Sequence, residues 1–196
     1  MSNLNKQIPL FPLPTIVMPG GLLPLRLFEL RYIDMVKECF KHGTGFGVCL
    51  AKPFSQQQVE EPYPHGTVVS LIDFDQGSDG LLHIVAEGTQ EFQLNQFTVG
   101  DKGLVTGEVS YLPPPPAQPL PERYLSLGVK LGVILDYVEQ HISYPDRQLD
   151  DAAWVCNRLL ELLPLDAQAK FDILNLIDLE ERLAALEAIQ FSVENG

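Results

Sequence analysis

The order of apolar and polar positions divides the chain into a strand-rich first part and a helix-rich second part. Apolar residues three and four apart between Leu30 and Phe40 predict a single helix in the first part. Around it, short apolar or alternating runs bounded by Gly and Pro predict strands over residues 22–28, 48–51, 67–74, 81–86, 91–95 and 105–111.

Turn signals join these strands into antiparallel pairs. Asp79-Gly80 lies between two apolar runs, as is typical of a hairpin, and residues 100–103 predict a second turn. Glu87-Gly88 interrupts the alternation and predicts a β-bulge. Residues 53–66 hold several prolines and glutamines and little apolar content, which indicates a loop.

A proline-rich stretch marks the clearest boundary. It begins with four consecutive prolines and has a semi-rigid, extended character. We therefore expect a β domain over residues 1–112, a linker over 113–122 and a helical bundle over 123–196. Because strands and helices are segregated along the chain, the fold class is α+β.

The second part has a helical period throughout. Apolar residues recur at spacings of three and four from Tyr124 to Ile142, and Leu125, Val129 and Val133 widen this surface. We expect this helix to be buried on more than one side. Three further helices are predicted after aspartates that suit an N-cap: Asp150 or Asp151, Asp166, and Asp178.

Two glycines within the first of these helices, Gly128 and Gly132, cost helix propensity. We expect both to permit the close approach of another backbone segment.

Composition excludes several classes of protein. An apolar fraction of 45% with 20% charged residues describes a folded chain. The net charge is −13, and acidic side chains outnumber basic ones on both sides of the proline run, which argues against nucleic acid as a partner. No apolar run has the length of a signal peptide or a membrane span. A cytoplasmic protein without a membrane partner is expected.

The chain lacks recognisable catalytic or metal-binding motifs. Cys39, Cys49 and Cys156 are few and far apart, so we expect buried free thiols. The histidines have no ligand-like companions, and the Gly43–Gly47 stretch lacks the Lys of a phosphate-binding loop. We predict no catalytic residues, no cofactor and no metal.

The segment from Pro19 to Tyr32, with Gly66–Ile72, Asp79-Gly80 and Val85–Gly88 in that order, resembles the N-terminal domain of Lon-type ATP-dependent proteases. Leu162–Leu165 and the segments after it are similar to the helical part of that domain. The resemblance implies a PUA-like β pseudobarrel followed by a helical bundle. It also implies a role in binding substrate proteins.

Catalysis is not part of this resemblance. Lon proteases carry a Ser–Lys dyad in a separate domain, and no residues here match it; Ser126 and Lys130 read as a surface pair. With the chain ending at Gly196, we expect a binding module without ATPase and protease domains, and so not an enzyme. Its partners would be unfolded or extended polypeptide segments.

Four apolar residues of the opening segment are the candidate peptide-binding residues: Phe11, Leu22, Leu23 and Phe28. The alternative for these four is packing in the core. The alternative for the whole chain is an adaptor for another protease or ATPase. An RNA-binding PUA-like protein ranks third because the chain is acidic.

Overall fold

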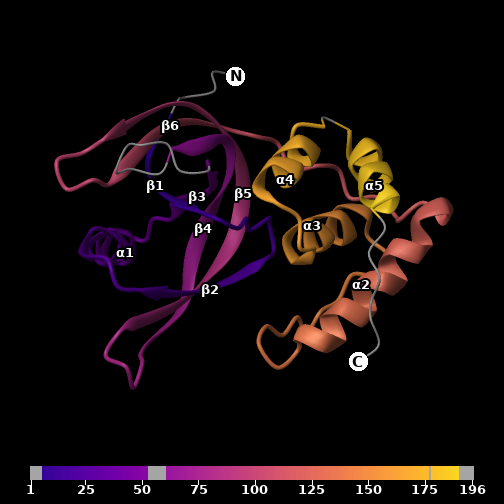
Figure 1. Cartoon of the computed structure of the whole chain (residues 1–196), viewed down its shortest axis with the longest axis horizontal. Coiled ribbons are helices and arrows are strands. Elements are labelled where there is room, and N and C mark those ends of the chain that lie inside the picture. The colour runs from indigo at the N-terminus through magenta and orange to yellow at the C-terminus, as the bar shows by residue number, and fades with distance from the viewer. Residues whose placement is uncertain (1–5, 53–60, 177, 190–196) are drawn as a thin grey trace. The chain divides into compact units, whose positions relative to one another are not determined.

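The computed structural model describes residues 6–52, 61–176 and 178–189. The chain folds into two compact units, Met1–Pro114 and Pro115–Gly196. All the strands named here belong to the first unit, and four of the five α-helices belong to the second (Figure 1). Among the described residues, no helix combines the length and apolar character that crossing a membrane requires.

The first unit is built on one mixed sheet of six strands, in the order β2-β5-β4-β3-β1-β6. β1 and β3 are parallel, and the other neighbours are antiparallel. β6 also pairs with the second half of β5, so the sheet curves strongly. The strands are β1 (Lys6–Leu13), β2 (Leu22–Leu27), β3 (Phe46–Ala51), β4 (Pro62–Gln76), β5 (Leu82–Val99) and β6 (Val105–Tyr111).

This architecture confirms the predicted α+β class and the pseudobarrel type. The predicted hairpins are present. Gly80 N–H donates to the Gly77 carbonyl in the β4–β5 turn, and Gly103 N–H donates to the Gly100 carbonyl in the β5–β6 turn. The turn residues therefore fix the register of the antiparallel strands.

The predicted bulge falls one residue later than expected. Val68 pairs with Gln90 and Val69 with Gly88, so Thr89 is the extra residue. Gly88 itself faces a loop: a Cβ added there would lie 2.1 Å from the Met18 carbonyl oxygen. The backbone of this loop and Gly88 are joined by two hydrogen bonds of 2.8 Å. Glycine is therefore needed at position 88 for close approach.

The predicted loop over residues 53–66 is wrong in its last part. β4 already begins at Pro62, which pairs with Ala51 beyond an irregularity in β3. Prolines are tolerated at the start of a strand because the missing N–H is not required there. Residues 53–60, which carry the rest of this prediction, lie outside the described residues.

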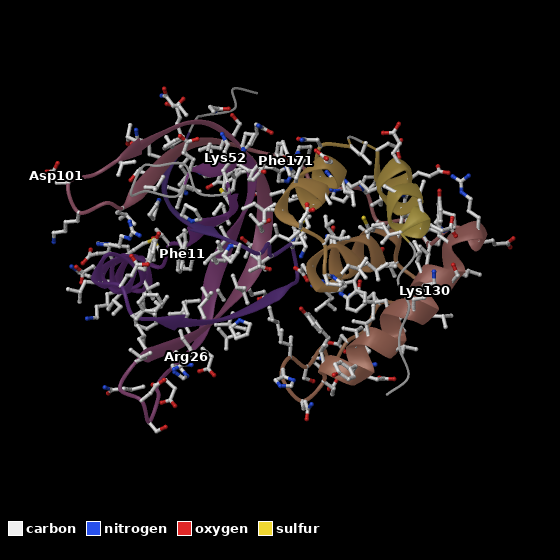
Figure 2. All side chains as sticks on the ribbon, viewed as in Figure 1. Phe11, Arg26, Lys52, Asp101, Lys130 and Phe171 are labelled. Carbon is white, nitrogen blue, oxygen red and sulfur yellow. The ribbon has the colours of Figure 1, made fainter. Side chains whose placement is uncertain are left out.

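The helix of the first unit, α1 (Leu30–His42), packs on one face of the sheet. Its apolar stripe, Tyr32, Met35, Val36 and Cys39, is buried against strand residues such as Phe11 and Phe46. The Phe11 and Tyr32 rings stack with their centroids 3.8 Å apart. Figure 2 shows Phe11 in the interior of the first unit. An ion pair lies at the junction of β2 and α1, where Arg31 Nη2 and Glu29 Oε2 are 2.7 Å apart.

The second unit is helical. Its elements are a 3₁₀ turn η1 (Glu122–Tyr124), α2 (Leu125–Val138), α3 (Ala152–Leu162), α4 (Ala167–Leu174) and α5 (Leu179–Ala188). The predicted caps are confirmed: Asp151, Asp166 and Asp178 each accept a backbone N–H at the start of the helix that follows. A buried ion pair joins Arg158 to Glu161 within α3.

The outer face of α2 contradicts the sequence prediction. Leu127, Leu131 and Leu135 are buried as expected. Leu125, Val129 and Val133 are exposed instead, and Tyr137 continues their row at the same four-residue spacing. Periodicity showed that the helix is apolar on two sides, but only the tertiary structure shows that one of those sides is uncovered.

Candidate functional site

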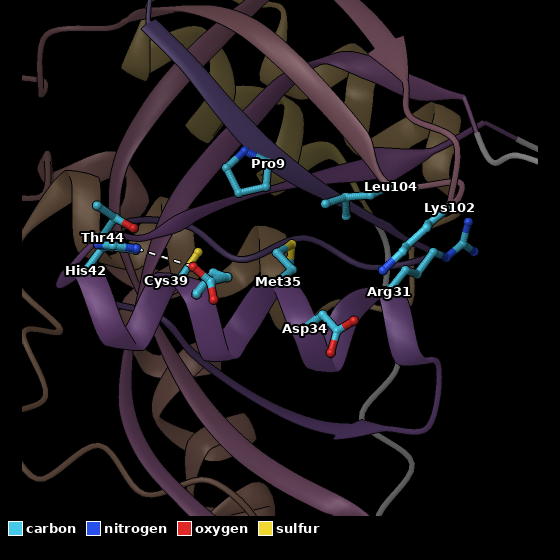
Figure 3. A pocket seen from close by; sticks show the side chains of 10 residues that line it. Pro9, Arg31, Asp34, Met35, Cys39, His42, Thr44, Lys102 and Leu104 are labelled. Carbon is cyan, nitrogen blue, oxygen red and sulfur yellow. Dashed lines mark ion pairs between the residues drawn. The ribbon is translucent and has the colours of Figure 1, made fainter.

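A pocket of about 360 Å³ lies on one flank of α1, between this helix, β1 and the β5–β6 turn. Its floor consists of Pro9, Met35, Cys39 and Leu104. Figure 3 shows Met35 and Cys39 pointing from α1 toward Pro9 and Leu104. These side chains meet because positions four apart share one side of a helix.

Charged side chains form the rim of this pocket. On α1 they are Asp34, Glu38 and His42, and the turn supplies Lys102. His42 Nε2 and Glu38 Oε2 are 3.3 Å apart, the pair dashed in Figure 3. Among the described residues, neither Asp34 nor Lys102 takes part in an ion pair. The rim can therefore contact charges of a ligand without losing a strong internal bond.

Arg31 closes one end of the pocket. Its Nη1 donates to the Gly103 carbonyl at 2.8 Å, and its Nη2 pairs with Glu29. Its guanidinium also lies 4.7 Å from the centroid of the Tyr32 ring. Arg31 thus holds the β5–β6 turn against α1, and its own charge is compensated.

Cys39 places a thiol in the pocket. Burial raises the pKa of this thiol, and the negative charge of Glu38 adds to the rise, while a hydrogen bond with Thr44 opposes it. The thiol is therefore protonated at neutral pH and a poor nucleophile. Cys49 and Cys156 are fully buried, which agrees with the predicted free thiols.

The other flank of α1 exposes large apolar side chains. Phe28, Leu30, Phe40 and Phe74 are 72%, 75%, 61% and 57% exposed. The Phe40 and Phe74 rings meet edge to face with centroids 5.4 Å apart. We name these four residues the α1 ridge.

The ridge follows the helix axis. Leu30, Ile33, Lys37 and Phe40 share one side of α1, since they are three, four and three residues apart. Ile33 is partly buried and packs against the core, as do Leu25 and Leu82 of the sheet. From Leu30 to Phe40 the ridge spans about 15 Å.

A second hollow of about 380 Å³ is more polar. Its lining includes Arg26 of β2, Asp73 and Asp75 of β4, and His83 of β5. The nearby Asp79 carboxylate has a lowered pKa, chiefly because the Leu81 N–H donates to it, with His83 and Arg26 adding to the effect. These interactions stabilise the β4–β5 turn and connect it to Arg26 of β2.

The structure separates the four candidate residues of the opening segment. Phe11 and Leu23 are buried, because the alternation of β1 and β2 directs them into the core. Leu22 is half-buried and pairs with Glu87. Only Phe28 lies fully at the surface, where it joins the ridge. A peptide-binding role for these residues stays a prediction.

Comparison with known proteins identifies the family. The family model described as the ATP-dependent protease La (LON) substrate-binding domain matches residues 7–189. The chain belongs to this family. Curated relatives include the Lon proteases of Erwinia amylovora, 23% identical, and Escherichia coli strain K12, 24% identical, each over 95% of this chain. The chain spans about a quarter of the length of these Lon proteases.

Solved structures show the same fold. A Lon N-terminal domain protein from Xanthomonas campestris is 37% identical, with a TM-score of 0.77 over 95% of this chain and 99% of that one. The N-terminal domain of Lon protease from the Mycobacterium avium complex is 18% identical, with a TM-score of 0.61 over 92% and 96%. This second likeness concerns the fold alone.

The pocket and most of the ridge were not found by sequence reasoning. Leu30 and Phe40 fit the helical period of the apolar residues, which predicts that both are buried, whereas the structure leaves both exposed. Pro9 and Leu104 reach the pocket only through the pairing of β1 with β6. No local pattern could have brought these residues together, since the distance between them in sequence is large.

Proposed function

We propose that this LON substrate-binding domain is a non-catalytic module that binds extended or unfolded polypeptide segments along α1. The observation that carries the proposal is the α1 ridge, whose four large apolar side chains are each more than half exposed to solvent. Clustered exposed apolar residues on a folded protein mark interaction surfaces. The family description, which names a substrate-binding domain of a protease, supports the same class of ligand.

The size of the surface suits a short stretch of chain. A ridge of about 15 Å accommodates four or five residues of an extended segment at about 3.3 Å per residue. Binding through apolar side chains does not require a fixed sequence, which fits a domain that recognises unfolded proteins.

The titratable groups do not favour catalysis. Cys39 is protonated and His42 is paired with Glu38 at the surface. His65 and Glu91 form a buried hydrogen-bonded pair between β4 and β5. Among the described residues, no group of three or more His, Cys, Asp or Glu side chains could hold a metal ion. We expect a bound polypeptide to stay intact, with or without ATP.

The experiment is a fluorescence-anisotropy titration with a labelled, permanently unfolded casein. The wild-type chain is compared with a Leu30→Ser/Phe40→Ser variant, which removes two ridge side chains. We expect affinity to fall about tenfold, since truncating central apolar contacts of an interface costs more than about 1 kcal/mol. Both residues are exposed, so the free energy of unfolding should change by less than about 1 kcal/mol.

The matched control is Leu125→Ser/Val129→Ser, which removes two exposed apolar side chains from α2. This control should bind casein like the wild type. Equal affinity of the ridge variant and the wild type would refute the α1 ridge as the binding surface. An absence of casein binding by the wild type would refute the proposed function.

A second candidate function is that of an adaptor for another protease or ATPase. It is favoured by the exposed row on α2, formed by Leu125, Val129, Val133 and Tyr137. A row at four-residue spacing is the kind of ridge that packs against a partner helix. Under this alternative, the α2 control variant would lose a stoichiometric partner that the ridge variant retains.

A further inference from the structure

We propose that the pocket beside α1 is a subsite for one large apolar side chain of a bound polypeptide, and that it selects segments with Lys or Arg next to that side chain. This inference deepens the proposed function and rests on it. It concerns the flank of α1 opposite the ridge, where the floor is apolar and the rim is charged.

The apolar floor of the pocket determines which kind of ligand group it can bind. Pro9, Met35 and Leu104 offer carbon and sulfur atoms, and Cys39 adds a protonated thiol. A volume of about 360 Å³ is at the lower end of ligand sites, which run from about 300 to 1,000 Å³. A cofactor would need several convergent polar groups to fix its orientation. An aromatic or long aliphatic side chain needs only the apolar floor.

The shape of the pocket suits an extended segment. Its α1 residues run from Arg31 to His42, which is about 16 Å along the helix. Five extended residues cover the same length, with the central one over Met35 and Cys39. The neighbours of the central residue then lie above the charged rim.

The rim determines which neighbours are favoured. Asp34 and Glu38 are exposed and one helical turn apart, so both carboxylates face the same side of the pocket. Within the described part of the chain, the ion-pair partners of Glu38 are His42 at 3.3 Å and Lys41 at 4.0 Å, both exposed, and such pairs contribute little to stability.

The cations at the opposite end are partly compensated. Arg31 is engaged by Glu29 and by the Gly103 carbonyl. Lys102 takes part in no ion pair among the described residues, but it is one cation against the two carboxylates of Asp34 and Glu38. With a net charge of −13 on the whole chain, a positively charged segment is attracted over a longer distance as well. Selection of basic neighbours is therefore expected, and added salt should weaken it.

Cys39 provides a direct reporter of occupancy. It is the one cysteine among the residues that line the pocket, while Cys49 and Cys156 are 1% and 0% exposed. Cys39 is 7% exposed and lines the pocket, so we expect a small alkylating reagent to react with it slowly, and to approach it through the pocket. A ligand side chain that fills the pocket should slow this reaction.

The experiment measures Cys39 alkylation by iodoacetamide, followed by mass spectrometry, in the presence of three nine-residue peptides. The first has a central Phe flanked by Lys on both sides. The second has Glu in place of Lys, and the third has Ser in place of Phe. We expect half-protection by the Lys–Phe peptide at a concentration about two- to fivefold lower than by the Glu–Phe peptide. The Ser peptide should not protect.

Variants test the rim. Asp34→Asn/Glu38→Gln should bring the half-protection concentrations of the Lys–Phe and Glu–Phe peptides closer together, leaving only the preference that the net charge of the chain produces. The matched control, Glu181→Gln/Glu187→Gln, removes two exposed charges from the second unit and should keep the preference. If both variants lose the preference for the Lys–Phe peptide, the preference arises from the net charge of the chain and not from the rim carboxylates.

The outcomes separate this inference from the proposed function. If casein binds but no peptide protects Cys39, the pocket is not a subsite and the proposed function stands. Equal protection by the Lys and Glu peptides would overturn the charge selection. If neither casein nor any peptide binds, the proposed function itself is refuted.

Discussion

Single residues in this chain show how the same amino acid serves different purposes. Gly128 and Gly132 lie four apart on α2 and were both expected to permit close approach. A Cβ added to Gly128 would lie 2.6 Å from the Leu149 carbonyl oxygen, which confirms the expectation there. A Cβ at Gly132 would meet only the Leu149 Cδ1 atom, at 3.5 Å, so this glycine is not required by its own unit.

The two glycines therefore predict opposite effects of the same substitution. Gly128→Ala should destabilise the chain by about 1–3 kcal/mol, because the backbone at Leu149 has to move. Gly132→Ala should stabilise it by up to about 1 kcal/mol, since alanine favours the helix. Urea unfolding followed by circular dichroism compares the two. A similar destabilisation by both substitutions would contradict this account, because it would mean that Gly132 is packed as closely as Gly128.

The thiol of Cys39 gives a pH-dependent prediction. Burial raises the pKa of this thiol, so less thiolate exists near pH 8.5 than in an ordinary cysteine. The rate of alkylation of Cys39 should keep rising above pH 9, where the rate for free glutathione has begun to level off. The Cys39→Ser variant identifies the background. Parallel pH profiles for Cys39 and glutathione would contradict the buried position.

At the scale of elements, local residues determine where helices and turns begin and end. Asp151, Asp166 and Asp178 could be recognised as caps from sequence, because a cap acts on the backbone only two or three residues away. The start of β4 at Pro62 could not be recognised, since it depends on pairing with Ala51, which lies in another strand. The α1 ridge could not be predicted either. Periodicity shows which side of a helix is apolar, but not whether another element covers that side.

The cap of α3 predicts a local loss of stability. Asp151 Oδ1 accepts the Trp154 N–H at 2.7 Å. Asp151→Ala should lower the free energy of unfolding by about 1 kcal/mol. Asp150→Ala is the matched control, because the adjacent Asp150 contributes a backbone carbonyl to Leu120 that alanine keeps. The control should stay within about 0.5 kcal/mol of the wild type, and an equal loss in both variants would contradict the role of the cap.

At the scale of the whole molecule, the chain is an acidic LON substrate-binding domain with a mixed sheet in one unit and a helical second unit. The family and the order of most elements could be predicted from sequence, because both follow from patterns spread along the chain. β1, which carries two prolines, is not among the predicted strands. The surface that we propose for polypeptides could not be predicted. It combines Leu30 and Phe40 of the helix with Phe74 of a distant strand.

Hydrogen exchange with mass spectrometry tests the central claim most directly. Backbone amides of the wild-type chain are followed with and without saturating unfolded casein, because bound surfaces exchange more slowly. The account predicts slower exchange in fragments covering residues 28–44, which contain α1 and both of its flanks. Unchanged exchange in these fragments, or protection confined to residues 125–138 of α2, would contradict it.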